Sequence, residues 1–121
     1  MTCANNGYYL AYQSDCVDLQ LALSGQPYNG TIKRTERVVC YQASGQSPHQ
    51  CCIALANPIR NAVDAELLNY VITLNNQCWD GKFGVAGIIT YTSIRSGCNN
   101  VCLTNHDRDP CMWFVASWDA W

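Results

Sequence analysis

The sequence is poor in charged residues, which make up 13% of its 121 positions, about half the usual share in globular proteins. Only two lysines occur, Lys33 and Lys82, and the formal net charge is −2. The basic cluster formed by Lys33, Arg34 and Arg37 is short, whereas nucleic-acid-binding domains carry a broad basic patch. We therefore expect no nucleic-acid partner.

Motifs for membrane insertion and for common catalytic sites are also missing. No run of about 18 apolar residues occurs, so we expect no membrane span. The Gly-x-Ser-x-Gly elbow of serine hydrolases does not occur. Gly81, Gly84 and Gly87 lie along an expected strand, where glycine allows close packing, and do not form a phosphate-binding loop before a helix. We expect no enzyme activity, no catalytic residue and no cofactor.

Cysteine, by contrast, is abundant, and nine cysteines with few lysines are typical of an oxidising, extracellular setting. Four disulfides leave one cysteine over, which is buried, exposed, or paired with a second chain as a disulfide-linked dimer. The sequence does not determine the pairing, except that adjacent cysteines on a strand face opposite ways and take different partners. The nine are Cys3, Cys16, Cys40, Cys51, Cys52, Cys78, Cys98, Cys102 and Cys111.

We expect a secreted protein with one domain over residues 1–121, long enough to bury a core. The chain opens with Met1-Thr2-Cys3-Ala4 and no leader-like segment, so we expect a mature form with an added initiator methionine. Asn29-Gly30-Thr31 is an acceptor sequence for N-linked glycosylation, which agrees with secretion.

The best-patterned stretch runs from Asp64 to Tyr91. Its first half has apolar residues at steps of three and four, which predicts an amphipathic helix that Asp64 caps. Its second half alternates with a period of two, which predicts a strand from Phe83 onward. One face of that strand carries Val85 and Ile89, and the other carries Ala86 and Ile88. We expect this segment to define the fold and the functional surfaces to lie in loops around it.

The remaining elements follow from the same periodicities. We expect a short helix that Ser14 and Asp15 cap and Gly25 ends. The order predicts an α+β class: a two-layer α/β sandwich with two helices on one face of an antiparallel sheet, in a split βαβ, ferredoxin-like arrangement stabilised by disulfides. Strands are expected at Tyr8–Tyr12, Arg37–Ala43, Cys51–Ala56 and Met112–Ser117, the short helix at Cys16–Leu23, and loops at 25–34, 44–49 and 98–111.

Two chemistries were weighed at the histidines and the last cysteines. Cys98, Cys102, His106 and Cys111 are four residues of the types that bind zinc. Thiolate ligands need a reducing compartment, however, so we favour disulfides and expect no metal. A nuclease would use His49 or His106 as an acid–base group, together with Glu36, Glu66 or Arg37. The spacing does not link the two histidines.

The chain ends in Ala-Ser-Trp-Asp-Ala-Trp, which places Trp118 and Trp121 in an expected exposed tail. Exposed tryptophan is enriched where proteins meet a partner. We therefore expect Trp118, Trp121, His49 and His106 to belong to a binding surface.

The element order resembles the secreted necrosis-inducing factors of fungi. The resemblance covers residues 14–98 and rests on Ser14-Asp15-Cys16 at a helix start, an arginine-led strand ending in Cys40, the helix at Asp64-Ala-Glu-Leu-Leu, and the strand Gly84-Val-Ala-Gly-Ile. That family is similar in architecture to yeast and smut killer toxins, which share the two-layer sandwich. The resemblance implies a virulence effector or killer toxin-like protein and carries over no catalytic residues.

We therefore predict a secreted, cysteine-rich effector or toxin-like protein that acts by binding. Its expected partner is a protein or cell-surface component of a host or competitor cell. The alternatives are a small secreted nuclease-like enzyme, and a carbohydrate-binding or antimicrobial module that uses the terminal tryptophans.

Overall fold

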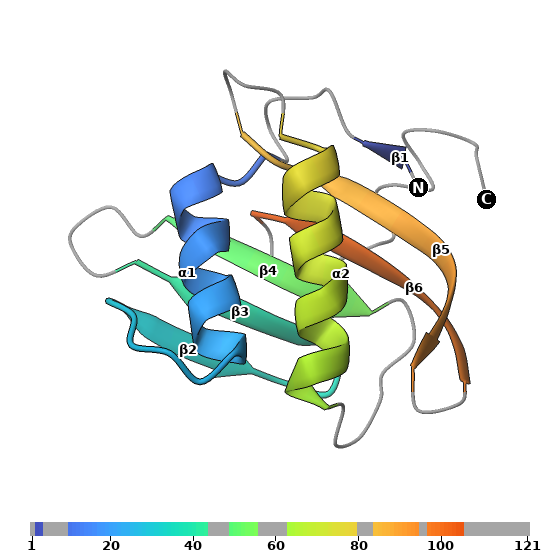
Figure 1. Cartoon of the computed structure of the whole chain (residues 1–121), viewed down its shortest axis with the longest axis horizontal. Helices are drawn as coiled ribbons and strands as arrows, with labels where there is room; N and C mark the ends of the chain where they lie inside the picture. Colours follow the sequence, from blue (N-terminus) through green and yellow to red (C-terminus); the bar gives the residue numbers. More distant parts are fainter. Residues whose placement is uncertain are drawn as a thin grey trace.

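The computed structural model describes residues 2–3, 10–43, 49–55, 63–79, 84–94 and 97–105. These residues form two helices and one six-stranded sheet, of which the first strand has only two residues (Figure 1). The elements in chain order are β1 (Thr2–Cys3), α1 (Gln13–Leu23), β2 (Thr31–Arg34), β3 (Val38–Gln42), β4 (Gln50–Leu55), α2 (Asp64–Gln77), β5 (Gly87–Ile94) and β6 (Gly97–Thr104).

All neighbouring strands in the sheet are antiparallel, in the order β1-β5-β6-β4-β3-β2. Because β6 runs antiparallel to both β4 and β5, those two strands are parallel to each other, and α2 connects them. The strands β2, β3 and β4 form a meander on the other side of β6. The strand β2 is therefore the edge of the sheet on that side.

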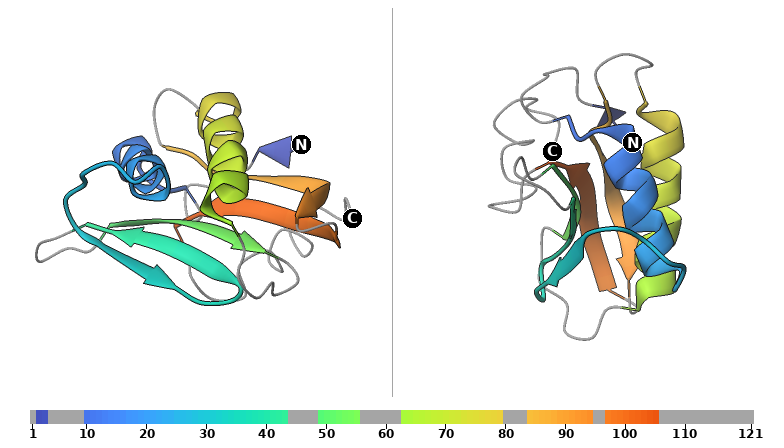
Figure 2. Two further views of the ribbon diagram at one scale, coloured as in Figure 1. Left: turned by 60° about the horizontal axis from the view of Figure 1, so that its bottom comes forward. Right: turned by 90° about the vertical axis from the view of Figure 1, so that its left-hand side faces the viewer.

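Both helices lie on the same face of the sheet (Figure 2). They run antiparallel and pack against each other, α1 over β3 and β4, and α2 over β5 and β6 (Figure 1). The expected α+β class, with two helices on one face of an antiparallel sheet, is confirmed.

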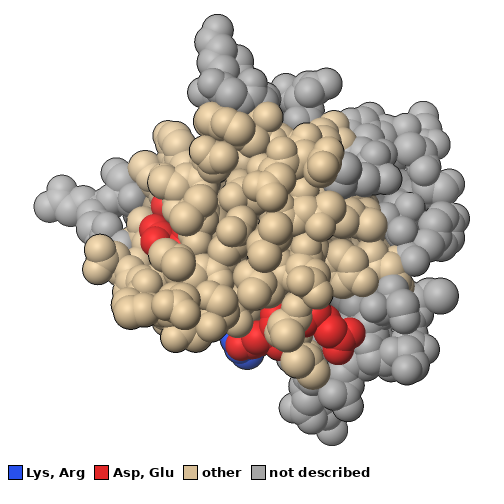
Figure 3. Space-filling view, viewed as in Figure 1, with Lys and Arg blue, Asp and Glu red and all other residues tan. Residues whose placement is uncertain are grey.

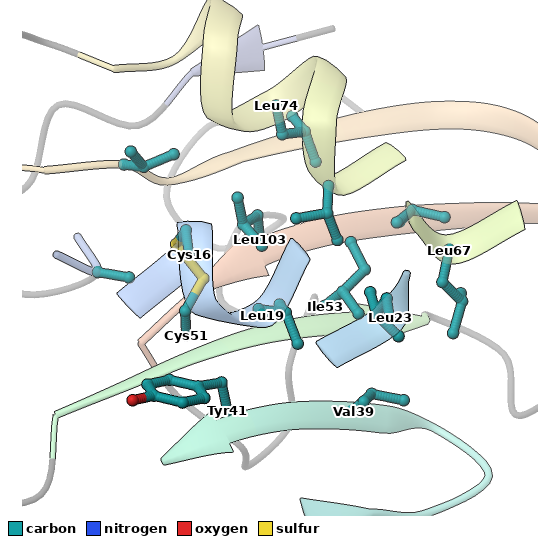
Figure 4. Close-up of a cluster of buried hydrophobic side chains, with 14 of the residues drawn as sticks. Cys16, Leu19, Leu23, Val39, Tyr41, Cys51, Ile53, Leu67, Leu74 and Leu103 are labelled. Atoms are coloured by element: carbon teal, nitrogen blue, oxygen red, sulfur yellow. A yellow bond between two sulfur atoms is a disulfide. The ribbon is translucent and has the colours of Figure 1, made fainter. Parts of the chain in front are cut away.

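The main core fills the space between the helices and the sheet (Figure 4). From α1 it takes Leu19, and from α2 it takes Val71 and Leu74, all of which have no exposed surface. The sheet contributes alternate residues, as the two-residue period of a strand requires. These sheet residues are Val39, Tyr41, Cys51, Ile53, Leu55, Val101 and Leu103, and Val85 joins them from the bridge before β5.

The opposite face of the sheet is buried as well, which corrects the expectation of a single covered face. A second cluster there contains the intervening residues, none of them more than 8% exposed. The described helices lie on the other face and do not account for this burial. The members are Leu10, Val38, Cys40, Cys52, Ala54, Ala86, Ile88 and Cys102.

Three disulfides join described residues: Cys3–Cys78, Cys16–Cys51 and Cys40–Cys52. Cys102 is disulfide-bonded too, to a cysteine outside the side chains that the structure describes. The prediction that Cys51 and Cys52 take different partners is confirmed, because Cys51 faces α1 and Cys52 faces the second cluster. This disulfide content agrees with an extracellular protein.

Several predicted elements differ from the observed ones. The predicted strand at Tyr8–Tyr12 is wrong over its described part, where Ala11 makes only an isolated bridge. Residues 25–34 are not all loop, since β2 occupies Thr31–Arg34. The predicted loop at 98–111 begins with strand β6, which pairs with both β4 and β5. The predicted strand at Met112–Ser117 lies outside the described residues.

The helix starts also differ from the prediction. Tyr12 and Val63 occupy the N-cap positions, and neither makes a side-chain cap. Asp64 lies in the first turn of α2 and forms an ion pair with Arg34 of β2 at 2.7 Å. At the other end of α1 the prediction is confirmed. Gly25 has φ of +79° and donates to Ala22, as in a glycine-ended helix.

Neither described helix is long and apolar enough to cross a membrane.

Candidate binding pocket

A pocket of about 170 Å³ opens where α1 and β4 begin and β6 has just ended. Three of its lining residues precede α1, two lie at the start of β4, and one follows β6. They are Leu10, Ala11, Tyr12, His49, Gln50 and Asn105. Segments far apart in the sequence therefore build it together.

The segment before α1 is held by a short bridge to the chain before β5. Ala11 and Val85 exchange two backbone hydrogen bonds, each 2.8 Å long. The neighbouring Gly84 has φ of +137°, and a Cβ at this position would overlap the carbonyl oxygen of Ala11. Only glycine permits this approach without strain. Gly84 thereby fixes the pocket wall that carries Ala11 and Tyr12.

Two aromatic rings meet at the mouth of the pocket. The rings of Tyr12 and His49 lie 4.4 Å apart between centroids, with 33° between their planes. Tyr12 is 56% exposed, the largest value among the large apolar or aromatic side chains of the described residues. His49 is also exposed, and its carbonyl accepts a 2.7 Å hydrogen bond from Ala43, which extends the β3–β4 ladder. The pair thus presents an aromatic surface to solvent from a fixed backbone.

A chain of amide groups forms the polar side of the pocket. The Gln42 side chain donates to Gln50 Oε1 at 3.2 Å, and Gln50 Nε2 donates to the Asn105 carbonyl at 2.9 Å. Gln42 and Gln50 are directly opposite each other in the β3–β4 register. The orientation of the Gln50 amide is therefore set from both sides.

The Cys16–Cys51 disulfide holds the two walls together (Figure 4). Cys16 lies four residues after Tyr12 on α1, and Cys51 directly follows Gln50 on β4. Both cysteines are fully buried. The bond therefore links the first turn of α1 to the strand that carries His49 and Gln50.

A buried carboxylate lies next to this linkage. Asp15 is 5% exposed, and its Oδ2 has no hydrogen-bond partner among the described residues. Burial raises the pKa of this carboxyl group, nearby His49 partly opposes the rise, and the negative charge of Asp18 adds to it. The ionised Asp15 carboxylate thus places negative charge near His49.

Tyr41, which packs under α1, is close to the carboxylates of Asp15 and Asp18. Burial raises the pKa of Tyr41, and the carboxylates of Asp18 and Asp15 raise it further. The Tyr41 hydroxyl donates to the carbonyl of Asn29, and its ring makes an edge contact with Tyr28 at 6.2 Å. Asn29, the predicted glycosylation site, is exposed in the loop before β2.

Positive charge is scarce around the pocket and the helices. None of the described lining residues is lysine or arginine, and neither α1 nor α2 contains one. On the helix-bearing face, the charged groups lie at the margins and the centre is uncharged (Figure 3). An anionic ligand would find no fixed cation in this lining.

Of the predicted binding surface, the structure places His49 in the pocket. Trp118, Trp121 and His106 lie outside the described residues, so whether they adjoin His49 stays a prediction. The nuclease groups Glu36 and Glu66 are absent from the described lining of the pocket. The alternative zinc set loses one ligand, since Cys102 is in a disulfide. No group of three or more metal-ligating side chains occurs in the described part of the chain.

Sequence reasoning missed Tyr12, Gln50 and Asn105. The pattern around Tyr12 predicts a strand, Asp15 fits a helix cap, and the two amide side chains belong to no motif. The only signal in the sequence is indirect, a histidine at the start of an expected strand that carries two cysteines. Comparisons with protein-family models, with curated proteins and with solved structures found no match.

Proposed function

We propose that this chain is a secreted effector or toxin-like protein that acts by binding a component of another cell, and that the Tyr12–His49 pocket is part of its binding surface. The observation that carries the proposal is the exposed aromatic pair, which is held at 4.4 Å on a pocket whose walls a buried disulfide joins. A preformed concave site in which apolar and aromatic side chains meet precisely placed polar groups is the usual form of a binding site. The resemblance to necrosis-inducing factors and killer toxins suggests a host or competitor cell as the target.

The layout of the sheet supports the architectural part of that resemblance. The unit β4–α2–β5, with β6 inserted between its parallel strands, corresponds to one split βαβ unit. We propose that the fold is a variant of the ferredoxin-like sandwich in which the first strand is reduced to the Ala11 bridge.

Cell-binding measurements test this proposal. Fluorescently labelled, oxidised protein should bind fungal or plant cells saturably, and Tyr12→Ala and His49→Ala should each weaken binding several-fold. Tyr28→Ala is the matched control, because Tyr28 is exposed but does not line the pocket. Equal binding by all variants would contradict a role for the pocket, and a lack of saturable binding to any cell type would contradict the function.

A nuclease-like enzyme is the second candidate, and the charge of Asp15 near His49 is the observation that favours it. A carboxylate beside an imidazole can support acid–base catalysis. The described lining lacks the lysine or arginine that would hold a phosphate. Ribonuclease turnover that disappears in His49→Ala would establish this candidate and displace the binding proposal.

A further inference from the structure

The size of the pocket limits what it can hold. Its volume of about 170 Å³ is below the range of roughly 300–1,000 Å³ that is typical for drug-sized ligands. A volume of this size suits a single six-membered ring better than a nucleotide or a peptide segment. The ligand is small, or it is the terminal unit of a larger molecule that extends into solvent through the open mouth.

The aromatic pair selects for a ligand with an apolar face. Tyr12 offers a broad exposed ring, and the contact with His49 holds that ring beside the pocket. Tyrosine combines an apolar body with a polar tip, so it suits ligands that are partly apolar and partly hydrated. The C–H face of a sugar ring has this character and stacks on aromatic rings.

The amide chain selects for hydroxyl groups. The Gln50 amide carries two N–H hydrogens and two oxygen lone pairs, and one of each is engaged with Asn105 and Gln42. The Gln50 amide therefore retains one N–H hydrogen and one oxygen lone pair for a ligand. The two existing hydrogen bonds fix its orientation. A hydroxyl, which donates and accepts, matches such a group better than an apolar side chain does.

The charges of the described residues disfavour anionic ligands. The described pocket lining contains no lysine or arginine, and the Asp15 carboxylate is near the lining residue His49, with one oxygen that lacks a hydrogen bond from any described residue. A phosphate, sulfate or uronic acid would be repelled by this carboxylate and would gain no compensating cation.

We propose, building on the binding function proposed above, that the pocket binds one neutral sugar ring stacked on Tyr12, as the terminal unit of a cell-surface glycan. The Gln50 amide binds hydroxyl groups at the edge of the ring. The site takes a single unit, so the intrinsic affinity for a free monosaccharide is in the roughly millimolar range.

Saturation-transfer NMR and calorimetry with the oxidised protein test this assignment. The neutral panel contains methyl glycosides of glucose, mannose, galactose and N-acetylglucosamine with their short oligosaccharides. The comparison panel contains the anionic sugars glucuronate and glucose 6-phosphate. At least one neutral sugar should bind at about 10 mM or below, with transfer strongest at its ring C–H protons.

The variants make the test specific to the stacking surface. Tyr12→Ala should weaken binding about tenfold, whereas Tyr12→Phe, which keeps the ring, and the control Tyr28→Ala should stay within about twofold. Tyr12 is exposed, so these variants are expected to fold, and their melting temperatures verify this. Any of three results would overturn the proposal: no neutral sugar binds, the charged panel binds more tightly than the neutral one, or Tyr12→Ala leaves binding unchanged. If Tyr12-dependent cell binding persists while every sugar is silent, only the sugar assignment fails.

Discussion

Removal of the Cys16–Cys51 disulfide is the sharpest test of how the fold supports the pocket. We consider the double variant Cys16→Ala/Cys51→Ala, which leaves no unpaired thiol at this position. Both sulfurs are fully buried between α1 and β4. The variant therefore removes the linkage between the two pocket walls without changing any residue that lines the pocket.

Its effect on stability follows from the loop that the bond closes. Cys16 and Cys51 are separated by 35 residues in sequence. With Cys40–Cys52 intact, a shorter path runs from Cys16 to Cys40, across that bond, and one residue back to Cys51, about 25 residues in all. Loop-closure entropy then assigns about 3.5 kcal/mol to the bond, a large share of the free energy of unfolding of a small domain.

The other two disulfides give an internal comparison. Cys40–Cys52 spans 12 residues, which corresponds to about 2.8 kcal/mol. Cys3–Cys78 spans 75 residues, but the path through Cys16–Cys51 shortens its loop to about 40, or about 3.9 kcal/mol. Guanidinium denaturation of the three double alanine variants, followed by circular dichroism, measures these differences.

Ligand and cell binding provide the second readout. Binding is measured without denaturant, where each variant remains folded. Loss of Cys16–Cys51 should weaken binding several-fold, because the disulfide no longer links the chain segments that carry Tyr12 and Gln50. Loss of Cys40–Cys52, which lies on the opposite face of the sheet, should leave binding nearly unchanged. A cost below about 1 kcal/mol for Cys16–Cys51, or equal loss of binding in both variants, would refute this account of the pocket.

Two further substitutions test the charge and the backbone of the site. Burial raises the pKa of Asp15 above its ordinary value of 3.8, so the folded protein holds the carboxyl proton more tightly than the unfolded chain does. The free energy of unfolding therefore falls as the pH rises from 3.8 toward the raised pKa. Asp15→Asn should therefore be more stable than wild type by about 1 kcal/mol at neutral pH, with the advantage gone below pH 3.8; equal pH profiles in chemical denaturation would contradict this. Gly84→Ala should cost about 1–3 kcal/mol and speed hydrogen exchange at Ala11 and Val85, and unchanged exchange would show that the bridge tolerates a Cβ.

The sequence was informative where a single periodicity governed a segment. The three-to-four spacing of Leu67, Val71 and Leu74 predicted α2, and these residues do face the sheet. Alternation likewise predicted that Val85 and Ala86 belong to different faces, which is what the two buried clusters show. Such local patterns survive folding because burial acts on the same side chains that create them.

It was less informative where pairing with distant strands decides the conformation. The strand β2 follows a segment rich in glycine, proline and asparagine and has one partly buried apolar residue, Ile32. It is a strand because it pairs with β3 over four positions. In β6, the cysteines suggested a stapled loop, yet residues 101–104 are all buried between β4 and β5. Tertiary pairing, and not local propensity, sets these two elements.

The pocket shows the same limit most clearly. Tyr12 and Gln50 are 38 residues apart in sequence, and Asn105 lies further along the chain. No spacing rule connects the three residues. What brings them together is a pair of long-range constraints: the Cys16–Cys51 bond and the Ala11–Val85 bridge that Gly84 permits. The disulfide acts on residues next to the lining, and the bridge acts on the backbone of Ala11 and not on its side chain. The side chains that line the pocket can therefore change while the disulfide and the glycine keep its shape, as for loops that a rigid scaffold positions.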